Sequence, residues 1–328
     1  MKKRLTLTSL LLAASLLLSS CSAFGRDIRF SVGNTMSTAF QIENMKCPRQ
    51  EALIYIMNYR NLYSHIGDQD LWSGAFDEDR LRASIKTSCI DNLSEVYILN
   101  LYAKENGIFL SEADDAKIET AAKEYYASLT EEEKKYSGAR EKDIHEMYTR
   151  YATAEKVYAE LMDSVDEEVS EDEARVMRAF VLYTKDPAKA NAAEAALSAG
   201  TSFDVVLATY GDGDRSQLSF GRNTYSSDVE DVIFRLENGE VSSLITADDG
   251  YYIVRCIEKY DEALSEENKT KILADRKDRV LTGIFESADS MYYSKINTTF
   301  WESIDISADN TNLKTDSFFL TLDKYYRS

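Results

Sequence analysis

Histidine, proline and cysteine are scarce in this sequence of 328 residues, which contains two histidines, two prolines and four cysteines. Two histidines leave little material for a His-based metal site or a Ser-His-Asp triad. Positive charge is also scarce: the sequence has 38 Lys and Arg residues and 57 Asp and Glu residues, which gives a formal charge of −19. A nucleic-acid groove needs a basic surface, so nucleic acid is excluded as a partner. No metal or other cofactor is expected.

The first 20 residues have the pattern of a signal peptide. Lys2, Lys3 and Arg4 precede an apolar stretch at residues 5–18, which is short for a membrane span. The stretch ends in Leu18-Ser19-Ser20-Cys21, which resembles the lipobox of bacterial lipoproteins. This resemblance implies lipidation of Cys21 and a location on the extracytoplasmic face of the cell membrane. An ordinary secretory signal or an uncleaved anchor is the alternative.

Removal of the signal peptide would make the chain still more acidic. Residues 1–20 carry three basic and no acidic side chains, so the formal charge would change from −19 to −22. Anionic lipids repel such a protein, and we expect acyl chains rather than a basic patch to hold it at the membrane. Cys47, Cys89 and Cys256 would then remain. Either Cys47 and Cys89 form a disulfide or these thiols are buried and unpaired.

The pattern of the first half predicts helices. Residues 39–42 are predicted to form one strand in the mixed segment 21–47, which we interpret as the lipidated N-terminus and linker. Apolar residues recur at three- and four-residue steps through residues 77–106, as is typical of an amphipathic helix, and Gly107 is suited to end it. Two capping-box signatures follow, Ser111 with Asp114 and Thr130 with Glu133. Helices are likewise predicted from Pro48 to about residue 65 and over residues 141–164. Residues 48–170 are therefore predicted to form a helical domain.

The second half alternates between strand and helix patterns. Residues 176–183 and 250–257 are predicted strands, and Asp186-Pro187 opens an alanine-rich helix that ends at Gly200. Shorter helices are predicted at residues 203–210 and 228–236. Together these elements predict an α/β domain at residues 171–262. A helix from residue 263 to about residue 294 and a tail complete the segment 263–328, which is expected to pack on the helical domain because its apolar stripe needs a partner.

The α/β segment resembles a parvulin-type (PpiC, rotamase) peptidyl-prolyl isomerase domain. The matching stretches are Ala199-Gly200-Thr201-Ser202-Phe203-Asp204, Phe234-Arg235-Leu236-Glu237-Asn238-Gly239-Glu240-Val241-Ser242 and Asp249-Gly250-Tyr251-Tyr252-Ile253-Val254. With the lipobox and the helical segment, the whole chain resembles the PrsA/SurA-like foldase lipoproteins. The resemblance implies an α+β fold, in which N- and C-terminal segments form an all-helical SurA-like chaperone domain and the parvulin-like domain is inserted between them.

The sequence departs from the parvulin pattern at the catalytic positions. Parvulins carry one histidine in the first strand, in a His-Ile-Leu-Val-like stretch, and a second in the last strand after Gly-Tyr. Phe180 and Tyr252 stand at these positions in our alignment, and both histidines of the chain, His65 and His145, lie outside the domain. Phenylalanine forms no hydrogen bond, whereas a tyrosine hydroxyl does. The resemblance therefore implies an isomerase whose catalysis is weakened.

The resemblance also implies the residues of the site. Tyr252, Asp212 and Asp214 are the candidate catalytic residues. The candidate substrate-binding residues are Phe180, Leu182, Tyr225, Val229, Phe234 and Asp249. Core packing is the alternative interpretation for Phe180, Leu182 and Phe234, and a solvated loop is the alternative for Asp212 and Asp214.

The sequence is consistent with three functions. The first is a lipid-anchored extracytoplasmic folding factor with prolyl isomerase activity, acting on unfolded or partly folded secreted polypeptides. The second is a chaperone or holdase that retains the parvulin fold as a non-catalytic binding module. The third, a solute-binding lipoprotein, is less favoured because the chain lacks the repeated strand–helix units that build two parallel-sheet lobes.

Overall fold

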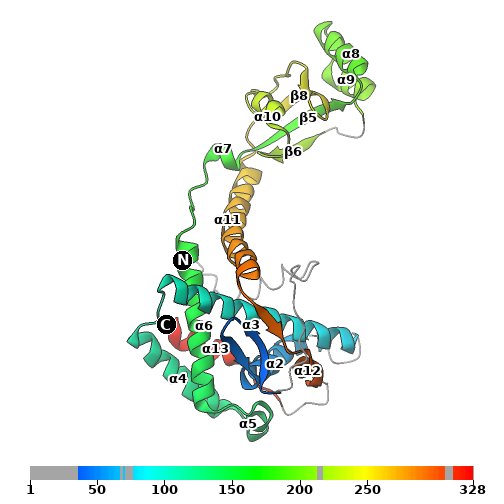
Figure 1. Cartoon of the computed structure of the whole chain (residues 1–328). Helices are drawn as coiled ribbons and strands as arrows, with labels where there is room; N and C mark the ends of the chain where they lie inside the picture. The colour runs from blue at the N-terminus through cyan, green and yellow to red at the C-terminus, as the bar shows by residue number, and fades with distance from the viewer. Residues whose placement is uncertain (1–35, 67–68, 71–76, 213–216, 307–312, 328) are drawn as a thin grey trace. The chain divides into compact units, whose positions relative to one another are not determined.

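The computed structural model describes residues 36–66, 69–70, 77–212, 217–306 and 313–327. It divides into two compact units (Figure 1). The larger unit comprises the chain up to Ser164 together with Leu281–Ser328, and the smaller unit comprises Val165–Val280. Helices dominate the larger unit, whereas the smaller unit contains a four-stranded antiparallel sheet. The combination of helices with small antiparallel sheets confirms the predicted α+β class.

Local sequence signals set the ends of the helices in the larger unit. Gly107 follows α3 in the left-handed conformation, with a φ of 71°, and both predicted capping boxes, at Ser111 and at Thr130, are confirmed. Pro48 ends a strand, and the helix that it was expected to open begins one residue later. The helices are α2 (Arg49–Ser64), α3 (Glu78–Asn106), α4 (Glu112–Ser128), α5 (Glu131–Ser137) and α6 (Glu141–Asp163).

A small antiparallel sheet joins the two ends of the chain within the larger unit. Its strand order is β2-β1-β9, with β1 at Thr38–Ile42, β2 at Met45–Pro48 and β9 at Ser294–Ile296. Strand β1 confirms the strand predicted at residues 39–42. Strands β2 and β9 span only four and three residues, which is too short for a recognisable sequence pattern. The remaining elements of this unit are β3 (His65–Ile66), β4 (Gln69–Asp70), α12 (Thr298–Ser303) and α13 (Phe318–Tyr326).

The C-terminal segment packs on the helices that precede the smaller unit. Phe318 is fully buried, and its backbone N–H donates to Asn58 Oδ1 at 2.9 Å. The hydroxyl of Tyr148 donates to the backbone oxygen of Phe318 at 2.7 Å. Glu133 accepts the backbone N–H of Lys314 at 2.8 Å. These bonds satisfy backbone groups that would otherwise be buried without partners, so the segment is fixed by polar as well as apolar contacts.

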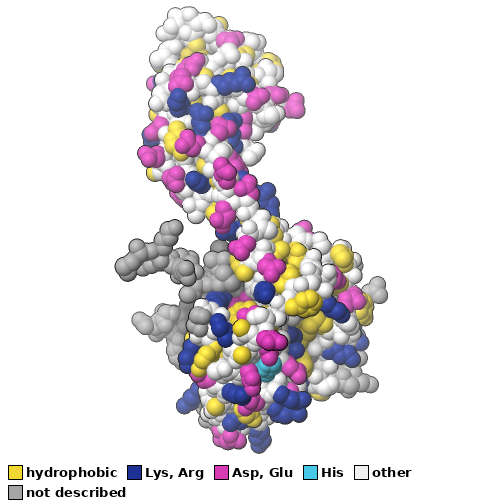
Figure 2. Space-filling model, turned by 90° about the vertical axis from the view of Figure 1, so that its left-hand side faces the viewer, with side chains coloured by type: hydrophobic (Ala, Val, Ile, Leu, Met, Phe, Trp, Pro, Cys, Tyr) yellow, Lys and Arg dark blue, Asp and Glu magenta, His cyan; other side chains and the backbone are white. Residues whose placement is uncertain are grey.

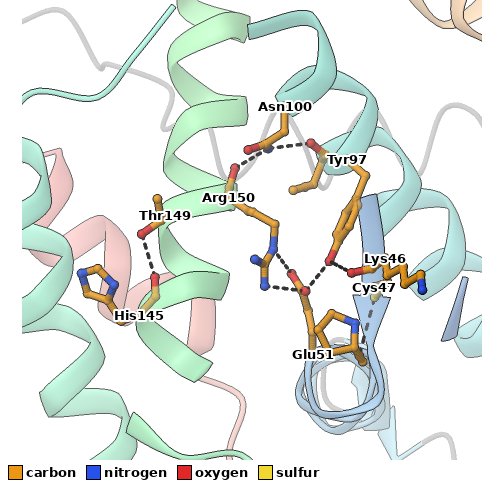
Figure 3. Close-up of polar contacts among 10 residues, drawn as sticks. Lys46, Cys47, Glu51, Tyr97, Asn100, His145, Thr149 and Arg150 are labelled. Carbon is orange, nitrogen blue, oxygen red and sulfur yellow. Dashed lines mark hydrogen bonds and ion pairs between the residues drawn. The ribbon is translucent and has the colours of Figure 1, made fainter. Parts of the chain in front are cut away.

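A buried ion pair links α2 to α6 (Figure 3). Glu51 is fully buried, and its carboxylate accepts hydrogen bonds from Nε of Arg150 at 3.1 Å and from Nη2 at 2.7 Å. The hydroxyl of Tyr97, on α3, donates to the same carboxylate at 2.6 Å. Burial acts to lower the pKa of Arg150, but the charge of Glu51 and its hydrogen bonds raise that pKa overall. One carboxylate therefore connects three helices.

A second carboxylate of α6 ties this helix to the C-terminus. Glu155 is 6% exposed and forms an ion pair with Arg327, directly after α13. Burial raises the pKa of Glu155 to about 7; Arg327 opposes this rise and the nearby charge of Asp323 adds to it. Because the pKa is raised above 4.5, this group favours the folded state fully below about pH 4.5, and that contribution is lost as the pH rises through 7.

Replacing Glu155 by Gln is expected to flatten the pH dependence of stability. Between pH 4.5 and 7 the native chain should lose about 2–3 kcal/mol of unfolding free energy that the variant retains, since one pKa unit corresponds to about 1.4 kcal/mol. Denaturant unfolding at a series of pH values measures the difference between the two chains. A difference in unfolding free energy that stays constant between pH 4.5 and 7 would contradict the raised pKa of Glu155.

The sheet of the smaller unit has the strand order β6-β5-β8-β7, and each neighbouring pair is antiparallel. Pro187 occupies the first turn of α8, as the sequence predicts. The strands are β5 (Val176–Thr184), β6 (Leu218–Gly221), β7 (Ile245–Ala247) and β8 (Gly250–Glu258). The helices are α7 (Glu171–Ala174), α8 (Pro187–Ser198), α9 (Phe203–Tyr210), α10 (Ser227–Ile233) and α11 (Glu262–Met291), of which the residues after Val280 belong to the larger unit.

The cysteines of the described chain are unpaired. Cys47, Cys89 and Cys256 are free and buried, and burial raises the pKa of each thiol. Of the two alternatives that the sequence leaves open, the structure therefore has free thiols in place of a disulfide. Cys21 and the signal segment lie outside the described residues. No described helix combines the length and the apolar character needed to cross a membrane.

Candidate functional site

The sheet of the smaller unit has a separate core on each face. Side chains alternate along a strand, so odd-numbered residues of β5 lie on one face and even-numbered residues on the other. The first face is covered by α10 and includes Val181 of β5 and Tyr252 of β8. The second face is covered by α8 and α9 and includes Leu182 and Ile253. A site can therefore draw side chains from one of these faces but not from both.

Two of the predicted substrate-binding residues lie on the face that α8 and α9 cover. Leu182 is fully buried there, and the Phe180 ring is 6.5 Å from that of Phe203. The guanidinium carbon of Arg255 lies 4.7 Å from the centre of the Phe180 ring. Because the sheet separates them, the structure does not bring Phe180 and Leu182 together with Tyr252. Their places fit the alternative of core packing on the second face.

Three tyrosines gather on the α10 face, and we call Tyr183, Tyr225 and Tyr252 the tyrosine cluster. Tyr183 lies directly opposite Tyr252 in the pairing of β5 with β8, with ring centroids 5.0 Å apart. The Tyr225 ring is 5.7 Å from that of Tyr252 and nearly perpendicular to it. Glu230 holds the loop of Tyr225, since its carboxylate accepts the backbone N–H groups of Thr224 and Tyr225. Tyr183 and Tyr225 are half-buried, and Tyr252 is 4% exposed.

Asp249, at the turn between β7 and β8, accepts hydrogen bonds from two members of the cluster. The Tyr252 hydroxyl donates to the Asp249 carboxylate at 2.6 Å. The Tyr183 hydroxyl donates to the backbone oxygen of Asp249 at 2.7 Å, since a carbonyl only accepts. Burial and the bond to Asp249 raise the pKa of Tyr252, so its hydroxyl keeps its proton at neutral pH. Both hydroxyl hydrogens are therefore committed to Asp249.

Gly250 allows this turn to lie close to Tyr183. Its φ is 154°, and a Cβ at this position would lie 2.7 Å from the Tyr183 ring and 2.9 Å from the backbone oxygen of Thr184. Neither distance is possible for a real side chain, so a larger residue would displace the turn. The glycine of the Asp249-Gly250 pair is thus required for the contact between Tyr183 and Asp249.

Val229 and Phe234 lie in the same core as the tyrosine cluster. Val229 is 1% exposed on α10 and Phe234 is 5% exposed directly after it. The Phe234 ring packs edge-on against Phe220, whose ring is 5.0 Å from that of Tyr225. Five of the predicted residues therefore share one region: Tyr225, Val229, Phe234, Asp249 and Tyr252. Tyr225 and Asp249 are the two nearest to solvent.

Asp212 lies beside the end of β5 and forms its own set of contacts. Its carboxylate accepts hydrogen bonds from Lys189 Nζ at 2.7 Å and from the Thr184 hydroxyl at 2.6 Å. These two bonds lower the pKa of Asp212 to about 2. Asp212 therefore stays ionised and ties α8 to β5. Asp214 lies outside the described residues.

The arrangement provides aromatic surface and hydrogen-bond acceptors, and it includes one residue that the sequence motifs did not point to. Tyr183 is absent from the predicted residues, although the odd-numbered alternation of β5 opposite Tyr252 is a signal that points to it. In the part of the chain that the structure describes, no group of three or more His, Cys, Asp or Glu side chains is arranged to hold a metal ion. Aromatic rings of this kind can bind apolar groups and cations.

Comparisons with known proteins show what the segment that contains this site is similar to. Residues 152–271 match the family model of the PPIC-type PPIase domain. Among the curated proteins, no sequence matches the chain. Similar solved structures include the peptidylprolyl isomerase PrsA of Bacillus anthracis, at 18% identity over 60% of this chain and 97% of that chain with a TM-score of 0.31.

Two further structures are similar over most of their length. PrsA of Bacillus cereus is 17% identical over 76% of this chain and 96% of that chain, with a TM-score of 0.36. A SurA-like chaperone structure from Campylobacter jejuni is 10% identical over 79% and 98%, with a TM-score of 0.28. Because these TM-scores are below 0.5, the assignment rests on the family model. Residues 152–271 are thus similar to the PPIC-type PPIase domain, which bears out the predicted resemblance to a parvulin-type domain.

Proposed function

We propose that this chain is a lipid-anchored, extracytoplasmic protein-folding factor whose PPIC-type domain binds prolyl segments and isomerises them slowly. The observation that carries the proposal is the match of the family model to residues 152–271, which include the tyrosine cluster. The expected ligands are unfolded or partly folded secreted polypeptides. The sequence Leu18-Ser19-Ser20-Cys21 supports attachment through acyl chains on Cys21.

Slow isomerisation follows from the hydrogen bonds of the site. Rotation about a prolyl bond has a barrier of about 18–20 kcal/mol, because the twisted amide has lost its resonance. A catalyst lowers this barrier by binding the twisted form better, with an apolar pocket for the ring and a donor for the carbonyl oxygen. Tyr183 and Tyr252 both give their hydroxyl hydrogens to Asp249. The cluster therefore retains a surface for proline, but Tyr183 and Tyr252 offer the twisted carbonyl no hydroxyl donor.

This loss of donors favours the second candidate, a chaperone that uses the domain mainly for binding. Exposed apolar side chains on the larger unit support it, since Phe109 is 69% exposed and Met291 is 65% exposed. A pocket of about 200 Å³ lies between α3 and the end of α11, with Ile98, Tyr102 and Ile284 in its lining. Figure 2 shows a face of the larger unit on which hydrophobic side chains gather. Such a surface suits an unfolded segment, whose apolar residues are exposed.

Suppression of client aggregation tests this proposal. Light scattering of a chemically unfolded client diluted into buffer should fall at least about twofold when an equimolar amount of the full chain is present. Replacing Phe109 and Met291 by Ser should weaken the suppression, because both side chains are more than half exposed and apolar. The matched control is Val205→Ser on the smaller unit, which removes an apolar side chain that is 54% exposed. Unchanged scattering with the native chain would contradict the proposed function.

A further inference from the structure

The tyrosine cluster offers aromatic surface next to an exposed carboxylate. The rings of Tyr183 and Tyr225 lie 5.0 and 5.7 Å from that of Tyr252, and Asp249 is exposed at the adjacent turn. An aromatic face attracts a cation that lies within about 6 Å of the ring centre. Several rings beside one carboxylate therefore form a surface suited to a Lys or Arg side chain.

Two hydrogen bonds of this surface converge on Asp249. Tyr183 donates its hydroxyl hydrogen to the Asp249 backbone oxygen, and Tyr252 donates its own to the Asp249 side chain. A carboxylate only accepts hydrogen bonds. An ammonium or guanidinium group carries only donors and matches such a surface, whereas a carboxylate carries only acceptors and is repelled by it.

Two arginines that pack on the same core already have hydrogen-bond acceptors away from Asp249. The guanidinium carbons of Arg222 and Arg175 lie 4.2 and 5.4 Å from the centre of the Phe234 ring. Arg222 forms two hydrogen bonds of 2.6 Å with the Asp172 carboxylate, and Arg175 donates to backbone oxygens at Lys259 and Phe234. These cations are engaged with other acceptors, so they do not take the place of a basic ligand at Asp249.

We propose that the tyrosine cluster and Asp249 select prolyl segments with a basic residue next to the proline. This inference rests on the proposed function, because it names the class of polypeptide that the same site accepts. The half-buried rings of Tyr183 and Tyr225 bind the basic side chain by cation–π contact, and Asp249 supplies the opposite charge. Tyr183 is a specificity-determining residue in this account, through its ring and its bond to the Asp249 backbone.

Paired peptides test the selectivity. Ala-Lys-Pro-Phe and Ala-Glu-Pro-Phe, both capped at their ends, are titrated into the full chain and their dissociation constants are measured by NMR. We expect the lysine peptide to bind at least about fivefold more tightly at 0.1 M salt, since a charge pair at a partly exposed site corresponds to about that factor. The ratio should fall as the salt concentration rises.

The net charge of the chain also attracts cationic peptides, so the local contribution needs a matched control. Asp249→Asn removes one charge at the cluster, and Asp248→Asn removes the same charge one residue away. Asp249→Asn should reduce the ratio of the two dissociation constants to about twofold or less. Asp248→Asn should leave most of this ratio unchanged. Equal effects of the two variants, or equal binding of the two peptides, would overturn the selectivity and leave the proposed function standing. Binding of neither peptide would overturn both.

Discussion

Replacing Arg150 by Met should destabilise the larger unit by about 3–5 kcal/mol, because it leaves the Glu51 carboxylate buried without its charge partner. Glu51 would keep only the hydroxyl of Tyr97 as a donor among its described contacts at 2.6–3.1 Å. Denaturant unfolding followed by tryptophan fluorescence measures this loss. Trp301 is 5% exposed within the larger unit, so its fluorescence reports on that unit.

A double variant separates the ion pair from the packing of its side chains. Glu51→Gln with Arg150→Met removes both charges and keeps side chains of similar size, so it should recover most of the stability that Arg150→Met loses. A loss below about 1 kcal/mol for Arg150→Met would show that the buried carboxylate does not depend on this partner. The same result would remove the basis for treating Glu51 as the link between α2, α3 and α6.

Placing histidines on the correct face of the sheet should raise the isomerisation rate. The His-Ile-Leu-Val-like stretch can be aligned one residue later, on Val181-Leu182-Tyr183-Thr184, and Val181 then stands at the histidine position. Val181 lies on the α10 face with Tyr252. The double variant Val181→His with Tyr252→His should therefore isomerise a prolyl peptide at least about tenfold faster than the native chain, since it restores donors for the twisted amide.

The matched control carries the same two histidines with one of them on the opposite face. Phe180→His with Tyr252→His should show no such increase, because Phe180 lies among the residues that α8 and α9 cover. Circular dichroism shows whether each variant keeps its fold. An equal increase in both double variants, or an increase only in the Phe180 variant, would contradict the assignment of the site to the α10 face.

The sequence predicts those elements whose signals are local. Ser111 and Thr130 accept the N–H groups that begin α4 and α5, and Gly107 adopts the left-handed conformation that ends α3. These features depend on residues within one helical turn, so they can be read from adjacent positions. The strand of residues 176–183 is similarly recognised from its β-branched and aromatic residues.

Contacts between distant residues lie beyond such an analysis. Glu51 and Arg150 are separated by 99 positions, and Asn58 and Phe318 by 260. Each belongs to a helix or tail whose local pattern would be the same without its partner. The pairing of β9 with β1 is of this kind too, because three residues carry no periodicity that distinguishes a strand from a loop.

The site shows a different limit, which comes from alignment. A motif match fixes a position only to within a residue or two, yet a shift of one residue moves a side chain to the other face of a sheet. Phe180 lies on the face opposite to Tyr252, whereas Tyr183, directly across from Tyr252, is not among the predicted residues. The alternation of side chains along β5 places Tyr183 on the same face as Tyr252 and Phe180 on the other face.

The central claim is that this PPIC-type domain binds prolyl segments while its tyrosines leave the prolyl bond slow to rotate. NMR exchange spectroscopy of a prolyl peptide with the full chain tests it, since one experiment reports both binding and rotation. We predict that the peptide resonances shift on binding and that no exchange between cis and trans forms appears on the timescale of seconds. Clear cis–trans exchange with the native chain, lost in the variant Tyr252→Phe, would contradict the claim and assign the Tyr252 hydroxyl a catalytic role.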